Sequence, residues 1–377
     1  MSQSLNIHFF AHSWVSDWNH GNAHFLRGLA RQLIRMGHRV TCYEPLGSWS
    51  LSNLVRQEGE LAISSIDEFR RVYPDLNIQF FNNDAQFAEF AQSHLRNADV
   101  VIIHEWTDPI VVNTILGLKQ SLGFRALLHD THHRAYTSAA EILKFRLDLF
   151  DGVLAFGEAI RRIYVEGFGV SRGWTFHEAA DVDTFRPLPL EKRDDLVWIG
   201  NWGDEERTRE LQEFLVEPAL QLRHRSFVVH GVRYPDAARR NLANAGIDFR
   251  GYVPNLSTPA VYGRSRLTLH VPRRQYTNGL SGIPTIRVFE ALACGAALLC
   301  SPWIDAEGLF RPGEDYVCVA DTRAMVAEIE HLLRDEGARR QIADNGLQTI
   351  RRRHTCALRA EQLLDIIDEL GREGPLR

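Results

Sequence analysis

The chain has 377 residues, a length typical of two domains of ordinary size. Hydrophobic residues make up 45% and charged residues 24%, the profile of a globular protein with enough apolar side chains for two cores. The net charge of -5 argues against a general polyanion binder, so no general nucleic-acid binding is expected. The basic run 351–353 is interpreted as a solvated face of a helix.

Cysteine spacing and hydropathy indicate the cellular compartment of the protein. The 5 cysteines are spread out, and no pair has the spacing of a metal or redox motif, which suits a reducing environment. The opening MSQSLNIHFFAHSW lacks the charged and apolar regions of a signal peptide, and no apolar run approaches the length of a membrane span. These features predict a cytoplasmic protein without a transmembrane segment.

The first half of the chain alternates short apolar runs with amphipathic ones. A helix is predicted over 22–36, and Gly37 follows it where a residue free to adopt positive φ is favoured. This alternation predicts a parallel sheet that helices cover on both faces. The predicted strands are 5–10, 39–43, 100–104, 125–129 and 152–154.

The pattern restarts after Pro187 and Pro189, within a Pro-rich and charged stretch, 181–193, that is interpreted as a linker. We therefore predict an α/β fold of two Rossmann-like, doubly wound parallel-sheet domains, 1–180 and 181–355, with a ligand site in the cleft between them. Residues 356–377 add a C-terminal helix. The predicted strands of the second half are 196–199, 227–230, 267–271, 297–300 and 316–319, and its helices are 322–335, 336–353 and 356–370.

Polar and aromatic residues fill the segment 12–22 between the first strand and its helix. Gly21 and Asn22 let the backbone approach a ligand, and Asn22 also suits the N-cap of the helix. Trp14 and Trp18 either stack on a sugar face or pack on the core. The dinucleotide fingerprint G-x-G-x-x-G is missing from this segment.

Two further polar clusters follow predicted strands: His104-Glu105-Trp106, and the run HDTHHR at 129–134. The composition of the run 129–134 resembles a metal site. However, the adjacent His132 and His133 are expected to point apart, so no metal is predicted. We predict instead that His132 and Asp130 form a hydrogen-bonding and charge-stabilising cluster. His104 and Trp106 are predicted to line the same cleft. Capping or buried structural roles are the alternative.

The segment 200–207 follows the first strand of the second half. Its glycines, beginning with Gly200 beside Asn201, permit a tight turn and close approach of a phosphate to backbone N–H groups. Arg207 or Arg209 supplies a forked positive charge suited to pyrophosphate.

The strongest signal is the run YTNGLSGIPTIRVFEALACG at 276–295, in which a glycine-rich loop enters a helix. The helix N-terminus is suited to a phosphate, and Arg287 lies within the first turn. Glu290 is one turn further on the same side, where its carboxylate is suited to both ribose hydroxyls. The alternative is a plain loop-helix-strand unit with an exposed glutamate.

The run 283–295 with Glu290, followed by 296–301, resembles the donor-binding segment of retaining GT-B glycosyltransferases of family four, most of all their CgeB-type branch. The stretches FRGYVP at 249–254, EAADVDTFRP at 178–187 and GHRV at 37–40 resemble further family segments in the same order, so the resemblance spans nearly the whole chain. It implies the GT-B fold and no cofactor, with a UDP- or GDP-sugar as substrate.

The resemblance also implies residue roles. Glu290 would bind the donor ribose, Arg207 the pyrophosphate with Arg287 as a second contact, and the backbone at Tyr252-Val253 the base. His132 would lie by the donor sugar, and Gly21-Asn22 would approach the donor phosphates or the acceptor. Trp18, His104 and Trp106 are assigned to the acceptor side, and the last helix would cross back to the N-terminal domain.

The chain departs from the family pattern at Gly282, where many members carry a first glutamate. We expect Asn278 or Ser281 to take over its sugar contacts. The predicted function is transfer of a sugar, a hexose by resemblance, to an unknown acceptor, with retention and without metal. A nucleotide-sugar epimerase or hydrolase of the same fold, which needs no acceptor, and a non-catalytic sugar-nucleotide-binding protein are the alternatives. Neither the acceptor nor the oligomeric state follows from the sequence.

Overall fold

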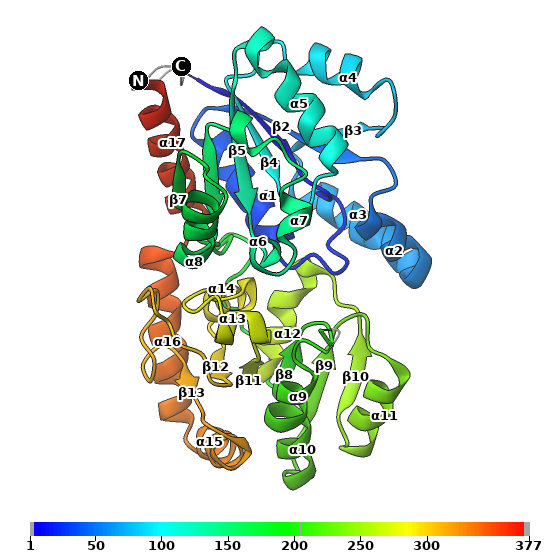
Figure 1. Cartoon of the computed structure of the whole chain (residues 1–377). Coiled ribbons are helices and arrows are strands. Elements are labelled where there is room, and N and C mark those ends of the chain that lie inside the picture. The colour runs from blue at the N-terminus through cyan, green and yellow to red at the C-terminus, as the bar shows by residue number, and fades with distance from the viewer. Residues whose placement is uncertain (1–3, 204, 373–377) are drawn as a thin grey trace. The chain divides into compact units, whose positions relative to one another are not determined.

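The computed structural model describes residues 4–203 and 205–372. The chain forms two compact units, the first made of Met1–Glu178 with Cys356–Arg377, and the second of Ala179–Thr355. Each unit is a parallel sheet flanked by helices (Figure 1).

The first unit contains a sheet with the strand order β3-β2-β1-β4-β5-β6-β7, and every pairing in it is parallel. All positions of β4 are buried, as expected for a central strand with helices on both faces. The order reverses between β1 and β4, and ligands of such sheets bind beyond the carboxyl ends of the strands at this point. The strands are β1 (Asn6–Phe10), β2 (Arg39–Pro45), β3 (Asn77–Phe81), β4 (Val100–His104), β5 (Arg125–Asp130), β6 (Gly152–Ala155) and β7 (Gly173–Thr175).

The helices of the first unit include the last helix of the chain, α17 (Cys356–Arg372). It packs against α1 (Figure 1). Gln362 donates from Nε2 to the Thr175 carbonyl at 3.0 Å, and Arg359 donates from Nε to the His177 carbonyl at 2.9 Å. The other helical segments are α1 (Ala23–Arg35), α2 (Trp49–Glu58), α3 (Glu60–Val72), α4 (Phe87–His94), α5 (Pro109–Leu122), α6 (Arg134–Thr137), α7 (Ala139–Ile142), η1 (Leu147–Leu149), α8 (Glu158–Arg162) and η2 (Ile163–Gly167).

The second unit repeats this plan with the strand order β10-β9-β8-β11-β12-β13, again entirely parallel. Its order reverses between β8 and β11. The strands are β8 (Asp194–Ile199), β9 (Phe227–His230), β10 (Asp248–Gly251), β11 (Ser265–His270), β12 (Ala297–Cys300) and β13 (Val317–Cys318). The helical segments are α9 (Thr208–Leu211), η3 (Gln212–Val216), α10 (Glu217–Gln221), α11 (Asp236–Asn244), η4 (Asn255–Ser257), α12 (Thr258–Arg264), α13 (Arg274–Asn278), α14 (Ile286–Ala293), α15 (Thr322–Arg334) and α16 (Glu336–Arg353).

The doubly wound α/β fold predicted from the sequence is confirmed, because both sheets are parallel and reverse their order once. Three strands were not predicted from the sequence: β3, β7 and β10. Each of them lies at the edge of its sheet. Edge strands are partly exposed, so they carry no continuous apolar run. No helix among the described residues has an apolar stretch long enough to cross a membrane.

Candidate functional site

The turn after β8 brings glycines, Asn201 and Arg207 to the point where the second sheet reverses. The glycines are needed here because neighbouring atoms leave no room for a side chain. A Cβ at Gly200 would lie 2.6 Å from the Trp198 ring, and one at Gly231 would lie 2.0 Å from the Gly200 carbonyl oxygen. Position 204 of this turn is outside the described residues.

Arg207 is held inside the second unit rather than displayed on its surface. Its guanidinium donates to the Val271 carbonyl at 3.2 Å, and to Asn201 through the carbonyl at 2.9 Å and Oδ1 at 2.5 Å. It also lies 5.1 Å from the Trp198 ring. Burial lowers the pKa of Arg207 from 12.5 to about 9, with a further contribution from nearby Arg273, so this side chain is still a cation at pH 7.

Two more arginines lie within electrostatic range of Arg207. Arg273, from the turn after β11, and Arg287, from α14, both lower the pKa of Arg207 through charge repulsion. Arg273 pairs with Glu206, and its guanidinium also donates to Asn201 Oδ1 at 3.4 Å. We call Arg207, Arg273 and Arg287 the arginine cluster. Three fixed cations on three different segments form an arrangement suited to a diphosphate.

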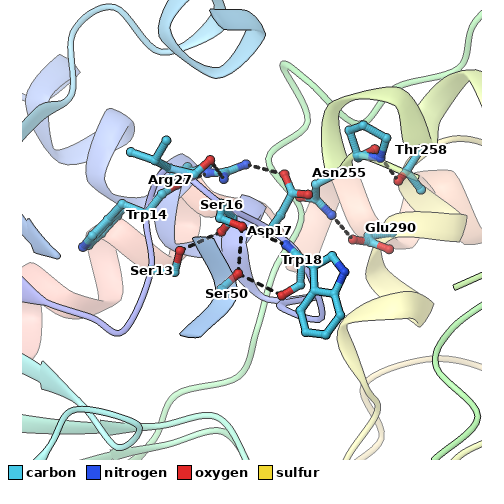
Figure 2. A network of polar contacts seen from close by, with 12 residues as sticks. Ser13, Trp14, Ser16, Asp17, Trp18, Arg27, Ser50, Asn255, Thr258 and Glu290 are labelled. Carbon is cyan, nitrogen blue, oxygen red and sulfur yellow. Dashed lines mark hydrogen bonds and ion pairs between the residues drawn. The ribbon is translucent and has the colours of Figure 1, made fainter. Parts of the chain in front are cut away.

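Helix α14 carries the strongest sequence signal, and Arg287 and Glu290 lie on the same side of it, as the spacing predicts. Arg287 is in the first turn and forms an ion pair with Glu290 on the same side. Glu290 is fully buried, so the alternative of an exposed glutamate is wrong. Its Oε1 accepts a hydrogen bond from Asn255 Nδ2 at 3.2 Å (Figure 2). Because a carboxylate accepts up to about four hydrogen bonds, these contacts are compatible with further donors.

The N-terminus of α14 has no side-chain cap. The N-cap residue Thr285 makes no capping bond, and its hydroxyl instead contacts His270 Nε2 at 3.1 Å. Backbone N–H groups at such an end favour an anion. Asn278 ends α13, where its Oδ1 accepts from the Thr277 hydroxyl at 3.2 Å, and Ser281 is exposed in the loop before α14.

Gly282 has a backbone reason for departing from the family pattern. Its φ is +93°, and a Cβ there would lie 3.1 Å from Ala306 Cβ. A glutamate is therefore strained at this position whatever its function. Tyr252 and Val253 follow β10 and are half-buried, and the next turn, η4, provides Asn255 to Glu290.

Three participants of this site were not predicted from the sequence: Arg273, Asn255 and His270. Arg273 carried a usable signal, because a doublet of arginines, 273–274, begins three residues after the end of a buried strand. Asn255 had no signal, since its contact with Glu290 joins residues 35 positions apart. His270 ends β11 and reaches the N-cap of α14, which only the pairing of strands reveals.

In the first unit, the loop after β1 is held in place by a buried carboxylate, that of Glu44, and by the buried guanidinium of Arg27, which Figure 2 shows. Glu44 accepts from the Trp14 and Val15 N–H groups at 2.6 and 2.9 Å. Arg27 donates to the carbonyls of the same two residues at 2.8 and 3.1 Å. These four hydrogen bonds tie the loop at Trp14 and Val15 to β2 and α1.

Both tryptophans of this loop pack inside the unit. Trp18 is 2% exposed, its Nε1 donates to Gln57 at 3.2 Å, and its ring meets Trp49 at 4.9 Å. Trp14 is fully buried and donates to the Tyr43 carbonyl. The structure thus favours the core-packing alternative for both indoles.

Asn22 occupies the N-cap position of α1, but its side chain makes no capping bond, which corrects that part of the prediction. Its φ and ψ of -77° and -1° are helical, whereas a capping side chain needs an extended backbone. The amide instead donates to the Thr131 carbonyl at 3.5 Å, which places Asn22 and the preceding Gly21 beside the turn after β5.

Histidine rings gather at the carboxyl ends of β1, β4 and β5. His12 lies 4.1 Å from His20 and 5.4 Å from His104, and His104 lies 5.7 Å from His129. His104 is fixed on both sides, by Glu105 at 3.0 Å from Nδ1 and by the Thr131 hydroxyl at 3.0 Å from Nε2. Neither ring nitrogen of His20 makes a hydrogen bond among the described residues.

Burial keeps these histidines neutral. It lowers the pKa of His12 to about 4 and that of His129 to about 3. It also lowers the pKa of His104 well below its ordinary value, and the neighbouring histidines add to this shift. The cluster therefore offers neutral hydrogen-bonding groups at pH 7.

Asp130 and His132 are joined through the backbone of His132. Asp130 accepts from the His132 backbone N–H at 2.9 Å and from the Tyr164 hydroxyl at 2.7 Å. Burial raises the pKa of Asp130 to about 6. The carboxylate thus shapes the turn that presents the His132 ring.

The rings of His132 and His133 lie together, which corrects the expectation that they point apart. Their centroids are 4.0 Å apart and the planes are inclined by 34°. Adjacent residues point apart only in an extended strand, and here the chain has left β5 and turns into α6. His132 also meets the ring of Trp106 at 5.1 Å, so residues from the turns after β4 and β5 lie together.

A substitution at Gly203 tests the role of the turn that holds Arg207. The φ of Gly203 is +88°, and a Cβ there would lie 2.7 Å from Cγ and 2.8 Å from Nε of Arg207. We expect Gly203→Ala to lower the free energy of unfolding of the second unit by about 1–3 kcal/mol and to weaken nucleotide binding by displacing Arg207. Denaturant titration and calorimetry measure the two effects.

Gly246→Ala is the matched control, because Gly246 has a φ of +74° and a Cβ there would meet nothing within 4 Å. It should show the backbone strain without the loss of nucleotide affinity. Equal nucleotide affinities in the two variants would contradict the role given to the turn.

Residues 207–365 match a family model described as "Glycosyl transferase-like". A comparison with curated protein sequences finds no significant match. Solved structures match over nearly the whole chain at low identity, which shows the fold.

Three of these structures illustrate the likeness. Sucrose-phosphate synthase from Thermosynechococcus elongatus is 14% identical, with 98% of this chain and 100% of that chain covered and a TM-score of 0.69. HepE from Anabaena, solved with UDP and glucose, is 13% identical, with 97% and 99% covered and a TM-score of 0.69. An alpha-glucosyltransferase, solved with UDP and a 13-mer DNA containing an HMU base, is 12% identical, with 97% and 100% covered and a TM-score of 0.64.

The two parallel-sheet domains and these likenesses define the GT-B fold. The family match covers most of the second unit and part of α17, and it identifies residues 207–365 as a glycosyl transferase-like region.

Proposed function

We propose that this glycosyltransferase uses a nucleoside-diphosphate sugar, with UDP or GDP as the leaving group. The observation that carries the proposal is the arginine cluster beside the uncapped N-terminus of α14. Negative charge grows on the leaving diphosphate in the transition state, and fixed cations and helix N–H groups stabilise it. In this proposal Glu290, held by Arg287 and Asn255, accepts the ribose hydroxyls.

The remaining predicted donor residues fit around this centre. Gly200 and Asn201 shape the turn that carries Arg207, and Tyr252 and Val253 precede Asn255 on the nucleobase side. Asn278 and Ser281 lie in the segment before α14 and are proposed to contact the transferred sugar. UDP in the HepE structure supports a uridine nucleotide as the first donor to test.

We assign the acceptor side to the first unit, where the histidines follow β4 and β5. His132, positioned by Asp130, would orient the transferring sugar, and His104 and Trp106 would contact the acceptor. We further propose retention of configuration, which rests on the resemblance of 283–295 to retaining enzymes. The proposal needs no metal, because the arginine cluster supplies the positive charge that a cation would otherwise bring.

A donor panel tests this proposal. UDP-glucose, other UDP-hexoses and GDP-mannose are titrated calorimetrically into the metal-free protein, and release of nucleoside diphosphate is followed with and without EDTA. We expect saturable binding of one donor and slow release that EDTA does not change. Absence of binding by every donor would overturn the proposal, and loss of turnover on chelation would overturn its metal-independent form.

The same panel separates the two alternatives. Fast turnover of donor that added acceptors do not accelerate would indicate an epimerase or hydrolase. Binding without any turnover across a broad acceptor panel would indicate a sugar-nucleotide-binding protein.

A further inference from the structure

Trp106 stands apart from the other aromatic residues at the strand ends of the first unit because it is exposed. Its side chain is 45% exposed, whereas His104 and His129 beside it are buried. It follows β4 directly, in the turn before α5. Exposure of one indole is not unusual by itself, but this ring adjoins a buried polar cluster and so offers an apolar face beside hydrogen-bonding groups.

The indole is nevertheless held firmly. The Arg134 guanidinium lies 4.3 Å from the ring centroid, and Arg134 is itself fixed by donating to the Glu105 carbonyl at 2.7 Å. The His132 ring meets the indole edge-on at 5.1 Å, and His12 lies 6.4 Å away. An exposed aromatic ring held in this way loses little conformational freedom when a ligand stacks on it.

Beside the Arg134 cation, the indole has a neutral hydrogen-bonding group near it, the His12 ring. Burial lowers the pKa of His12 to about 4, so this ring is neutral at pH 7, and its Nδ1 makes no hydrogen bond among the described residues. Neutral imidazoles both donate and accept hydrogen bonds, which suits hydroxyl groups. An apolar ring rimmed by such groups matches a sugar, which has a C–H face and a rim of hydroxyls.

The charge of the first unit argues against a nucleic-acid acceptor. Its two segments contain 19 Lys and Arg against 24 Asp and Glu, a net charge of -5, whereas the second unit has 24 of each. Proteins that hold DNA neutralise its phosphates with an excess of basic side chains. The first unit instead has an excess of acidic side chains.

We propose that the acceptor is a neutral saccharide whose C–H face stacks on Trp106, with its hydroxyl groups hydrogen-bonded by the neighbouring histidines. This rests on the proposed function of the protein as a transferase, and it adds the chemical class of the acceptor and the residue that recognises it.

The test titrates methyl glucoside, maltose, cellobiose, lactose and a 13-nucleotide DNA duplex into the full chain saturated with UDP. Binding is followed by tryptophan fluorescence and by calorimetry. We expect one saccharide to bind saturably, with the half-saturating concentration raised about tenfold in Trp106→Ala and largely restored in Trp106→Phe. The duplex should not bind.

Trp49→Ala is the matched control, since Trp49 is 54% exposed on α2 of the same unit. It should bind the saccharide as the wild type does. Equal saccharide affinity in Trp106→Ala, binding of the duplex alone, or no saccharide binding would overturn the inference.

UDP affinity, measured in the same samples, reports on the proposed function separately. Intact UDP binding without Trp106-dependent saccharide binding refutes the acceptor inference alone. Absence of binding of both UDP and GDP to the wild type refutes the proposed function.

Discussion

Replacing Glu290 by alanine is expected to lower the affinity for the nucleoside-diphosphate sugar by about 10- to 100-fold. A hydrogen bond to a charged group contributes about 1.5–3 kcal/mol, and every 1.4 kcal/mol is about tenfold in affinity. The carboxylate is held by Arg287 from one side and Asn255 from the other, so it is oriented before a nucleotide binds. Isothermal titration calorimetry with UDP and with the UDP-sugar measures the loss.

Removing a buried carboxylate also leaves Arg287 without this partner, so part of any effect can come from the fold. Glu290→Gln separates the loss of nucleotide contacts from the loss of stability, because it keeps the side-chain volume and the contact with Asn255 while removing the charge. Thermal unfolding monitors the stability of both variants. We expect Glu290→Gln to melt close to the wild type and still bind the nucleotide weakly.

The control for this experiment is an arginine–glutamate pair with the same spacing at the surface. Arg311 and Glu314 form an i,i+3 ion pair at 2.7 Å, and the Glu314 side chain is 60% exposed. Glu314→Ala should leave nucleotide affinity unchanged. If Glu290→Gln and Glu314→Ala bind the nucleotide equally well, Glu290 does not contact the ribose.

Acidification is expected to destabilise the first unit between pH 6.5 and about 4. Burial lowers the pKa of His12 to about 4 and that of His129 to about 3, so in the folded chain both stay largely neutral until the pH approaches these values. The unfolded chain takes up protons on both histidines below pH 6.5. Their contribution to the free energy of unfolding is therefore complete above pH 6.5 and is lost as the pH falls.

Linkage predicts a loss of about 2 kcal/mol at pH 5 for each of these two histidines. Asp130 acts in the opposite sense, because burial raises the pKa of this carboxyl to about 6 and the folded chain favours its protonated form. The stabilising contribution of Asp130 to the free energy of unfolding grows as the pH falls from 6 toward 4, and it offsets part of the loss caused by the histidines. Since His8 also has a pKa lowered to about 4 by burial, we expect the histidines to dominate.

Urea titrations at pH 7.5, 6.0 and 5.0 measure this dependence, and His129→Phe isolates one contributor. His129 lies between the rings of Phe25 and Phe176, at 5.9 and 5.7 Å, and its Nε2 makes no hydrogen bond among the described residues, so phenylalanine suits the site. The variant should lose about 2 kcal/mol less than the wild type between pH 7.5 and 5.0. Parallel profiles for the two proteins would refute the buried neutral state of His129.

The sequence by itself determined the α/β class, the central strands and the helix that carries Arg287 and Glu290. Central strands such as β4 are buried on both faces, so they appear as uninterrupted apolar runs that need no tertiary information. The spacing of Arg287 and Glu290 was also sufficient, because residues three apart on a helix share a side. Local periodicity encodes both features.

Tertiary structure alone decided which distant groups meet. The arginine cluster joins loops after β8 and β11 with α14, and these loops become neighbours only because β8 and β11 pair in the sheet. Trp18 and Trp106 are both tryptophans in polar turns after strands, yet one is 2% exposed and the other 45%. The difference arises because Gln57 and Trp49 of α2 cover Trp18, while Arg134 supports the Trp106 ring and leaves much of the side chain exposed. Burial of a turn residue depends on what the rest of the chain packs against it, and short-range sequence patterns do not record those partners.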